Sequence, residues 1–211
     1  MPTLLLALVA VASGLLMSFS VLAQNFPTRT VKMVVGTPPG GSVDVAARVV
    51  SEKLSVLWKQ SVVVENRAGA SEIIATELVS NAPPDGYTLL MASLNVVTIN
   101  PVVFKKLPYD AATGLVPIAL TTRNAMVFVA SNKAPFGSLK ELFDTARSQT
   151  DAVAWASSGR ATLNHIAGEW LAADAGIKLF HIPYKGAAAA GMAVLTGEVP
   201  LGIVTDRKSV V

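Results

Sequence analysis

The sequence predicts an α/β protein made of two similar lobes, each with a mainly parallel sheet flanked by helices. Short apolar runs alternate with amphipathic stretches along most of the 211 residues, a pattern typical of parallel sheets covered on both faces. Two strand–loop–helix units, whose loops are rich in small residues, begin about 120 residues apart. This repetition indicates one such unit in each lobe, with a ligand cleft where the carboxyl ends of the strands meet.

Residues 1–23 are predicted to be a secretory signal peptide. Residues 4–22 carry no charge, and cleavage is expected after Ala23. The first three residues lack Lys and Arg, so an uncleaved membrane anchor of about 20 residues is the alternative. The chain has no Cys, which excludes a lipid anchor on Cys, disulfides and thiolate metal sites.

The first lobe is expected to span residues 24–122. Short apolar runs bounded by polar or turn residues predict its strands. Apolar residues at helical spacing from Val43 to Leu57 predict its long helix, with Ser42 as the N-cap. The expected elements are strands at 31–35, 61–65, 87–92 and 116–120, helices at 42–57 and 71–81, and an irregular segment at 94–110.

The second lobe is expected to span residues 123–211. Ser138 and Glu141 have the spacing of a capping box at the start of a helix. A later helix carries Leu163, Ile166 and Trp170 on one face. The expected elements are strands at 126–130, 152–156, 178–182 and 200–204, and helices at 138–148, after 162, and at 187–196.

The loop from Gly36 to Ser42 is the most informative stretch of the chain. It contains Pro38-Pro39-Gly40-Gly41, so it is stiff and permits close approach of a bound group. It directs backbone N–H groups and the positive end of a helix toward one point, which suits an anion. It is not a P-loop, because Ser42 stands where the Lys is required. An ordinary tight turn is the alternative.

The loop from Ser157 to Thr162 has the same arrangement in the second lobe, between a predicted strand and a predicted helix. It offers hydroxyl side chains, a glycine and the N–H groups of a helix start. Arg160 either adds positive charge or points to solvent. Each loop alone is equally explained by a structural turn, but two such loops in two lobes favour an anion-binding cleft.

No motif in the sequence indicates a catalytic or metal centre. His165 and His181 are isolated and lack clustered carboxylates, so neither a metal nor a cofactor is expected. The sequence has no nucleophile elbow of the G-x-S-x-G type. Its net charge of +3 comes from scattered Lys and Arg without interleaved aromatic residues, so no nucleic-acid partner is expected. A secreted enzyme acting on an anionic small molecule is the alternative, with His165 as the candidate catalyst.

A series of short motifs extends this picture across nearly all of residues 24–205. The motifs are Pro38–Asp44, Val63–Ala70, Ala82–Leu89, Asn100-Pro101, Lys106–Asp110, Ser157–Gly159, His165–Glu169 and Pro183–Gly186. In their order and spacing they resemble the Bug family, the TctC-like extracytoplasmic solute-binding receptors of tripartite tricarboxylate transporters.

The resemblance implies a type II-like periplasmic binding protein that closes around a dicarboxylate, tricarboxylate, acidic amino acid or aromatic acid. It also implies a periplasmic monomer without enzymatic activity that contacts membrane transporter subunits transiently. In the family, the two loops hold one carboxylate of the ligand. Carried over, the expected ligand-binding residues are Thr37, Pro38, Gly40, Gly41, Ser93, Ser157, Ser158, Gly159 and Thr162.

The sequence departs from the family pattern at three places. Ala161 stands where the family usually has Gly, and Thr37 replaces a common aromatic residue. The family pattern continues by roughly another third beyond Val211, and residues 206–211 do not fit it. We therefore expect a C-terminally truncated second lobe. An inactive product with unpaired sheet edges is a further alternative.

Overall fold

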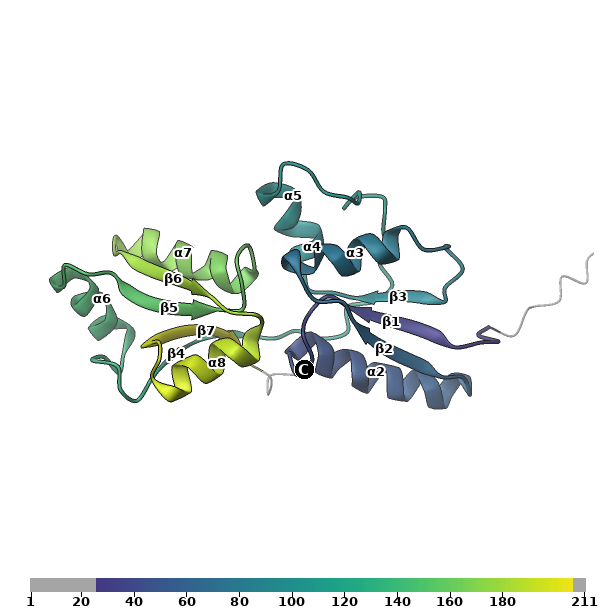
Figure 1. Ribbon diagram of the computed structural model, residues 1–211, viewed down its shortest axis with the longest axis horizontal. Coiled ribbons are helices and arrows are strands. Elements are labelled where there is room, and N and C mark those ends of the chain that lie inside the picture. The colour runs from purple at the N-terminus through teal and green to yellow at the C-terminus, as the bar shows by residue number, and fades with distance from the viewer. Residues whose placement is uncertain (1–25, 207–211) are drawn as a thin grey trace, which may run out of the picture.

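The computed structural model describes residues 26–206. The predicted signal peptide, residues 1–23, lies outside the described residues. Two α/β lobes stand side by side, the first drawn in purple to teal and the second in green to yellow (Figure 1). The predicted fold class is therefore confirmed. The boundary that the sequence predicts after residue 122 lies in the extended segment linking the two sheets.

The first sheet is parallel throughout, with the strand order β2–β1–β3. The central strand is apolar except for the exposed Lys32, and Val31, Val34 and Val35 are completely buried because both faces of the sheet are covered. Helices α2 and α3 lie on opposite faces of this sheet (Figure 1). The elements of this lobe are β1 (Val31–Val35), α2 (Ser42–Trp58), β2 (Val62–Asn66), the 3-10 turn η2 (Ala70–Glu72), α3 (Ile73–Ser80), β3 (Thr88–Met91), α4 (Asn95–Thr98) and α5 (Asn100–Val103).

The second sheet has the strand order β4–β7–β5–β6. Strand β5 pairs in parallel with both β6 and β7, whereas β4 pairs antiparallel with β7 at the sheet edge. The sheet is thus mainly parallel, as the sequence predicts. The elements of this lobe are β4 (Met126–Ala130), α6 (Leu139–Ser148), β5 (Val153–Ser157), α7 (Leu163–Ala175), β6 (Leu179–Pro183), α8 (Ala187–Thr196) and β7 (Leu201–Thr205).

Three local expectations are wrong. Gly41, not Ser42, is the N-cap of α2, and Ser42 is the first helical residue. Residues 94–110 contain the short helices α4 and α5 rather than only irregular chain. The apolar run at 116–120 forms no strand, and Val116 and Ile118 are 85% and 80% exposed. An apolar run becomes a strand only where a partner strand lies beside it, which periodicity alone does not reveal.

The core of the second lobe is centred on Trp155, which is completely buried and packs with Leu142 and Ile203. Helix α7 approaches this ring closely at Gly168. A Cβ atom at position 168 would lie 2.2 Å from Cη2 of Trp155. The absence of a side chain at this position therefore sets how closely α7 packs on the sheet.

Gly168→Ala is expected to destabilise the protein by about 1–3 kcal/mol, because the added methyl group overpacks the core against Trp155. Gly191→Ala in α8 is the matched control, since a Cβ there meets nothing within 4 Å. The free energy of unfolding of the control should rise by up to about 1 kcal/mol, because Ala has a higher helix propensity than Gly. Urea unfolding followed by circular dichroism measures both changes, and equal stabilisation of the two variants would contradict this packing.

Candidate functional site

The two predicted loops occupy equivalent positions in the two lobes. The first follows β1 and leads into α2, and the second follows β5 and leads into α7. In parallel sheets this is the carboxyl edge of the strands, where ligands of α/β proteins bind. Both loops are therefore placed where the sequence predicts them.

Two hydrogen bonds join the lobes beside the loops. Asn95 Oδ1 accepts one from the backbone N–H of Leu163, the first residue of α7, at 3.0 Å. The hydroxyl of Ser71 donates the other to the backbone carbonyl of Arg160, at 2.8 Å. The side chain of Asn95 is 4% exposed, so the first of these bonds is shielded from water.

The first loop also touches the second lobe directly. A Cβ atom at Gly186 would lie 3.2 Å from Cγ of Pro38, so Pro38 packs against this glycine. The N–H of Gly186 in turn donates to the backbone carbonyl of Ser158 in the second loop, at 3.2 Å. Pro38 of the first lobe and Ser158 of the second lobe therefore both contact Gly186 at the interface between the lobes.

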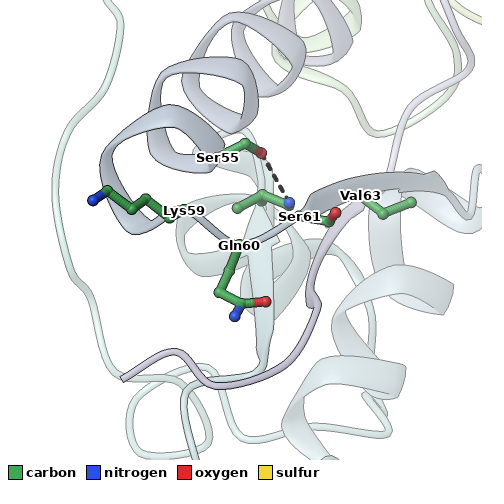
Figure 2. A pocket seen from close by; sticks show the side chains of 6 residues that line it. Ser55, Lys59, Gln60, Ser61 and Val63 are labelled. Carbon is green, nitrogen blue, oxygen red and sulfur yellow. Dashed lines mark hydrogen bonds between the residues drawn. The ribbon is translucent and has the colours of Figure 1, made fainter. Parts of the chain in front are cut away.

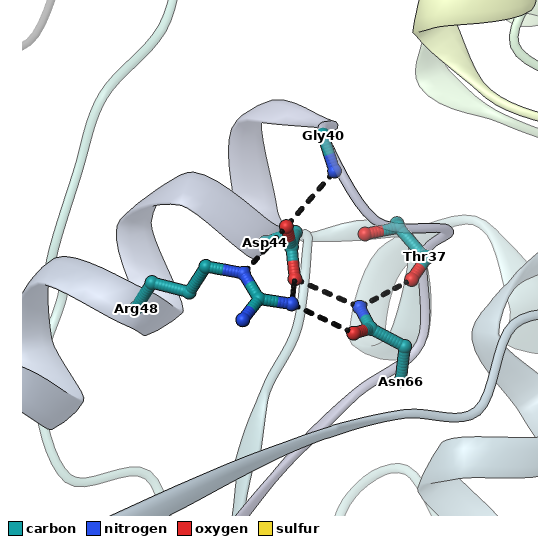
Figure 3. Close-up of polar contacts among 5 residues, drawn as sticks. All are labelled: Thr37, Gly40, Asp44, Arg48 and Asn66. Atoms are coloured by element: carbon teal, nitrogen blue, oxygen red, sulfur yellow. Dashed lines mark hydrogen bonds and ion pairs between the residues drawn. The ribbon is translucent and has the colours of Figure 1, made fainter.

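The first loop is held by the carboxylate of Asp44, which is 2% exposed (Figure 3). Arg48 donates to it from Nε and Nη2, both at 3.0 Å. Asn66 donates from Nδ2 at 2.9 Å, and the N–H of Gly40 donates at 2.9 Å. Burial alone raises the pKa of Asp44, but the bonds from Arg48, Gly40 and Asn66 outweigh burial and hold this pKa below its ordinary value.

The hydroxyl of Thr37 is buried without a hydrogen-bond partner among the described residues. It lies under Gly41, where a Cβ atom would be 3.7 Å from Oγ1 of Thr37. Gly41 is the N-cap of α2 and has no side chain with which to cap the first-turn N–H groups. Thr37 and Gly41 therefore leave hydrogen-bonding capacity for a bound group, whereas the N–H of Gly40 is engaged by Asp44.

Ser93 follows β3 and is engaged by a residue that the sequence analysis does not single out. Its N–H donates to the carboxyl group of Glu72 at 3.1 Å, and its hydroxyl donates to the same group. Glu72 is 5% exposed, and burial raises its pKa, against the opposing effect of the two bonds from Ser93. The sequence offers little signal for Glu72, because the same helical segment also contains the exposed Glu77.

Hydrogen bonds within the second loop determine its shape. The hydroxyl of Thr162 caps α7 by accepting from the N–H of His165 at 3.3 Å, and it donates to the carbonyl of Gly159 at 2.8 Å. Ser158 Oγ donates to Thr162 Oγ1 at 3.4 Å. Gly159 has φ +139°, and Ala161 has φ +56°, in the region that glycine occupies most easily. Ala161 therefore holds a conformation that glycine adopts with less strain.

The hydroxyl of Ser157 points into the lobe rather than out of it. Ser157 is completely buried, and its Oγ lies 2.7 Å from Nε2 of His181. The same hydroxyl contacts the carbonyl of Gly159 at 3.0 Å. A Ser–His pair at this distance has the geometry of an activated nucleophile, but here it is sealed from any substrate. Ser157 can meet a ligand only through its backbone.

His165, His181 and Trp155 form a stack beneath the second loop. The rings of His165 and His181 have centroids 4.1 Å apart, and the ring of His181 lies 4.5 Å from that of Trp155. Burial lowers the pKa of His181 to about 4, helped by His165 and Arg160, and burial lowers the pKa of His165 as well. Both rings are therefore neutral near pH 7 and act as packing groups rather than as cations.

The described residues hold no group of three or more His, Asp and Glu side chains arranged to bind a metal ion. In this part of the chain no helix is long and apolar enough to cross a membrane. A shallow depression lined by Ser55, Lys59, Gln60 and neighbouring residues lies at the turn between α2 and β2 (Figure 2). It is at the opposite edge of the first sheet from the loops, so it is not part of this site.

Residues 46–209 match the model of the TctC family, described as the tripartite tricarboxylate transporter family receptor. The chain belongs to this family. It is 39% identical over 179 residues to a UPF0065 protein of Bordetella bronchiseptica, covering 85% of this chain and 53% of that protein. It is 34% identical over 184 residues to the protein BugT of Bordetella pertussis, covering 87% of this chain and 56% of BugT.

Solved structures of similar proteins share the fold of this TctC-family chain. The periplasmic binding protein BugD has 33% identity and a TM-score of 0.78, with 85% of this chain and 60% of BugD covered. A protein of R. palustris solved with adipate has 30% identity and a TM-score of 0.82, with the same coverage. MatC from Rhodopseudomonas palustris, solved with bound malate, has 28% identity, a TM-score of 0.78, and coverage of 85% and 61%.

These relatives confirm the predicted family and fold, and they are receptors and binding proteins rather than enzymes, as the sequence predicts. The chain spans about half the length of the curated relatives and about 60% of the solved structures. The individual ligand contacts named from the sequence stay predictions.

Asp44→Asn is expected to lower the free energy of unfolding by about 1.5–3 kcal/mol at neutral pH, because charge-assisted hydrogen bonds are lost. The native state holds the pKa of Asp44 below the value of 3.8 expected for the unfolded chain. The ionised carboxylate of Asp44 therefore stabilises the folded protein above about pH 3.8, and this stabilisation is lost as the pH falls through the pKa of Asp44 in the folded state. Urea titrations of both proteins at neutral and acidic pH measure this difference.

Asp144→Asn is the matched control, because it removes a carboxylate that pairs with Lys140 at 2.6 Å on the exposed face of α6. Solvent weakens such pairs, so its effect should be smaller. An Asp44→Asn deficit of the same size at acidic and neutral pH would contradict the role of the ionised carboxylate.

Proposed function

We propose that this protein is a periplasmic receptor that captures a small carboxylate and delivers it to the membrane subunits of a tripartite tricarboxylate-type transporter. Membership of the TctC family supports the receptor role. The ligands of two structural relatives, adipate and malate, support a carboxylate as the bound group. Two relatives described as periplasmic support the location.

The observation that carries this proposal is the pair of equivalent loops flanked by contacts between the lobes. A helix N-terminus attracts an anion through its N–H groups and dipole, and here two such termini belong to opposite lobes. The hydrogen bonds from Leu163 to Asn95 and from Ser71 to Arg160 hold the lobes together beside them. We propose that the lobes, residues 24–122 and 123–211, close on the ligand in a hinge motion of the monomer.

We assign the carboxylate contacts to the residues that line the two loops and to Ser93. Thr37 and the first turn of α2 supply donors in the first lobe, since the hydroxyl of Thr37 has no partner among the described residues and α2 has no side-chain cap. Backbone groups of the second loop supply donors in the other lobe. The assigned residues are Thr37, Pro38, Gly40, Gly41, Ser93, Ser157, Ser158, Gly159 and Thr162.

Adipate and malate are expected to raise the melting temperature of this protein, whereas neutral sugars are not. A ligand at about 100 times its Kd stabilises a protein by about 2.7 kcal/mol, which corresponds to about 5–10 °C for a chain of this size. A thermal shift assay against a panel of small acids and sugars measures this. A shift with sugars and none with any acid would overturn the proposal.

Thr37→Val is expected to change stability and affinity in opposite directions. The methyl group replaces a buried hydroxyl without a partner among the described residues. The free energy of unfolding of the ligand-free protein should therefore rise by about 1 kcal/mol. Binding of the carboxylate that stabilises the wild-type protein should weaken about tenfold, because one donor is lost. Calorimetric titration measures the affinity, and urea unfolding measures the stability.

Thr196→Val is the matched control, since its hydroxyl donates to the carbonyl of Met192 in α8, away from the loops. Its carboxylate affinity should equal that of the wild-type protein. Equal affinity of Thr37→Val and wild type would remove Thr37 from the site.

A further inference from the structure

Glu72 is a buried carboxyl group among the segments that form the proposed site. In the described part of the chain no Lys, Arg or His side chain forms an ion pair with it. Gly36, at the start of the first loop, packs directly on it, since a Cβ there would lie 2.6 Å from Cβ of Glu72. Both donors of Ser93 point to its oxygens. A buried carboxylate without a cation destabilises a fold, so stability does not explain this residue.

The backbone at Glu72 is strained and reaches across to the second lobe. Ala70, Ser71 and Glu72 have φ angles of +45°, +54° and +71°, a conformation that is unfavourable for residues with a side chain. Strain of this kind persists where the surrounding structure imposes it, and it clusters at ligand clamps. The hydroxyl of Ser71 donates to the carbonyl of Arg160, so this segment contacts the second loop.

The groups facing Glu72 leave its charge uncompensated. Ser93, after β3, is neutral, and so is Asn100, in α5, which donates to the backbone carbonyl of the neighbouring Ser71. Tyr109 is the titratable side chain on this side, and burial together with the charge of Glu72 raises its pKa, so it stays neutral. Asp44, in α2, is already paired with Arg48. A ligand carboxylate entering the first lobe therefore meets the charge of Glu72.

We infer that Glu72 links carboxylate binding to the uptake of one proton, which makes it a specificity-determining residue of the proposed site. The inference rests on the proposed function. When Glu72 is ionised, it repels a ligand carboxylate and occupies both donors of Ser93. When Glu72 takes a proton from solvent, the repulsion disappears and the hydroxyl of Ser93 is released to the ligand. The proton returns to solvent when the ligand leaves.

The test compares adipate binding to the wild-type protein and to Glu72→Gln by calorimetric titration between about pH 5 and pH 9. The amide has the shape of the acid, accepts from Ser93 and carries no charge. The wild-type Kd should rise by up to about tenfold per pH unit above the pKa of Glu72, with one proton taken up per ligand. Glu72→Gln should take up no proton at this site and bind more tightly than wild type at pH 9. Titration of adipate itself is common to both proteins.

Two further variants keep the test decisive. Glu77→Gln removes an exposed carboxylate of α3 and should retain the wild-type pH profile. Glu72→Gly is a second charge-free variant, because glycine tolerates the φ of +71° if the Gln variant does not fold. A charge-free variant with the wild-type pH profile overturns the inference.

The failures of the two proposals are distinguishable. Wild-type protein that binds adipate without pH-linked proton uptake overturns the role of Glu72 and leaves the receptor function standing. Folded wild-type protein and variants that bind neither adipate nor malate at any pH overturn the receptor function, and the inference about Glu72 falls with it.

Discussion

The hydrogen bonds that converge on Asp44 are the constraint on which the first half of the site depends. They tie the first turn of α2 to the loop after β1 and to the end of β2, through Gly40, Arg48 and Asn66 (Figure 3). Asn66 also donates to the carbonyl of Thr37 at 3.0 Å, so the loop is held at both ends. With two prolines between these points, little conformational entropy remains to be lost on binding.

A second feature of the molecule is that its own side-chain acceptors already accept hydrogen bonds from many of the backbone N–H groups at the carboxyl ends of the strands. This happens in both lobes, so a ligand meets fewer free N–H groups than the loop pattern implies. At the proposed site, the donors that stay free and the charge of the nearby acceptors would then set the specificity. The internal pairs are Gly40 with Asp44, Ser93 with Glu72, Leu163 with Asn95, and Ala161 with His165.

The second loop is supported differently from the first. Among the described residues no ion pair holds its backbone, and the stack of Trp155, His165 and His181 supports it from below. Desolvation keeps both imidazoles neutral, so they contribute packing and two hydrogen bonds, one between His181 and Ser157 and one from the N–H of Ala161 to Nδ1 of His165. One lobe thus positions its loop through a charged network, and the other through neutral hydrogen bonds and aromatic packing.

The sequence by itself determined the fold class, most of the strands and helices, the family and the position of both loops, because local periodicity and short motifs report these directly. Only the tertiary structure decided which loop donors are free and that Glu72 lies beside Ser93, since these contacts join residues 21 and 68 positions apart. It also decided that the run at 116–120 is not a strand and that Ser157 faces inward. Burial and partner choice depend on which segments meet in space, and no local pattern in the chain records that.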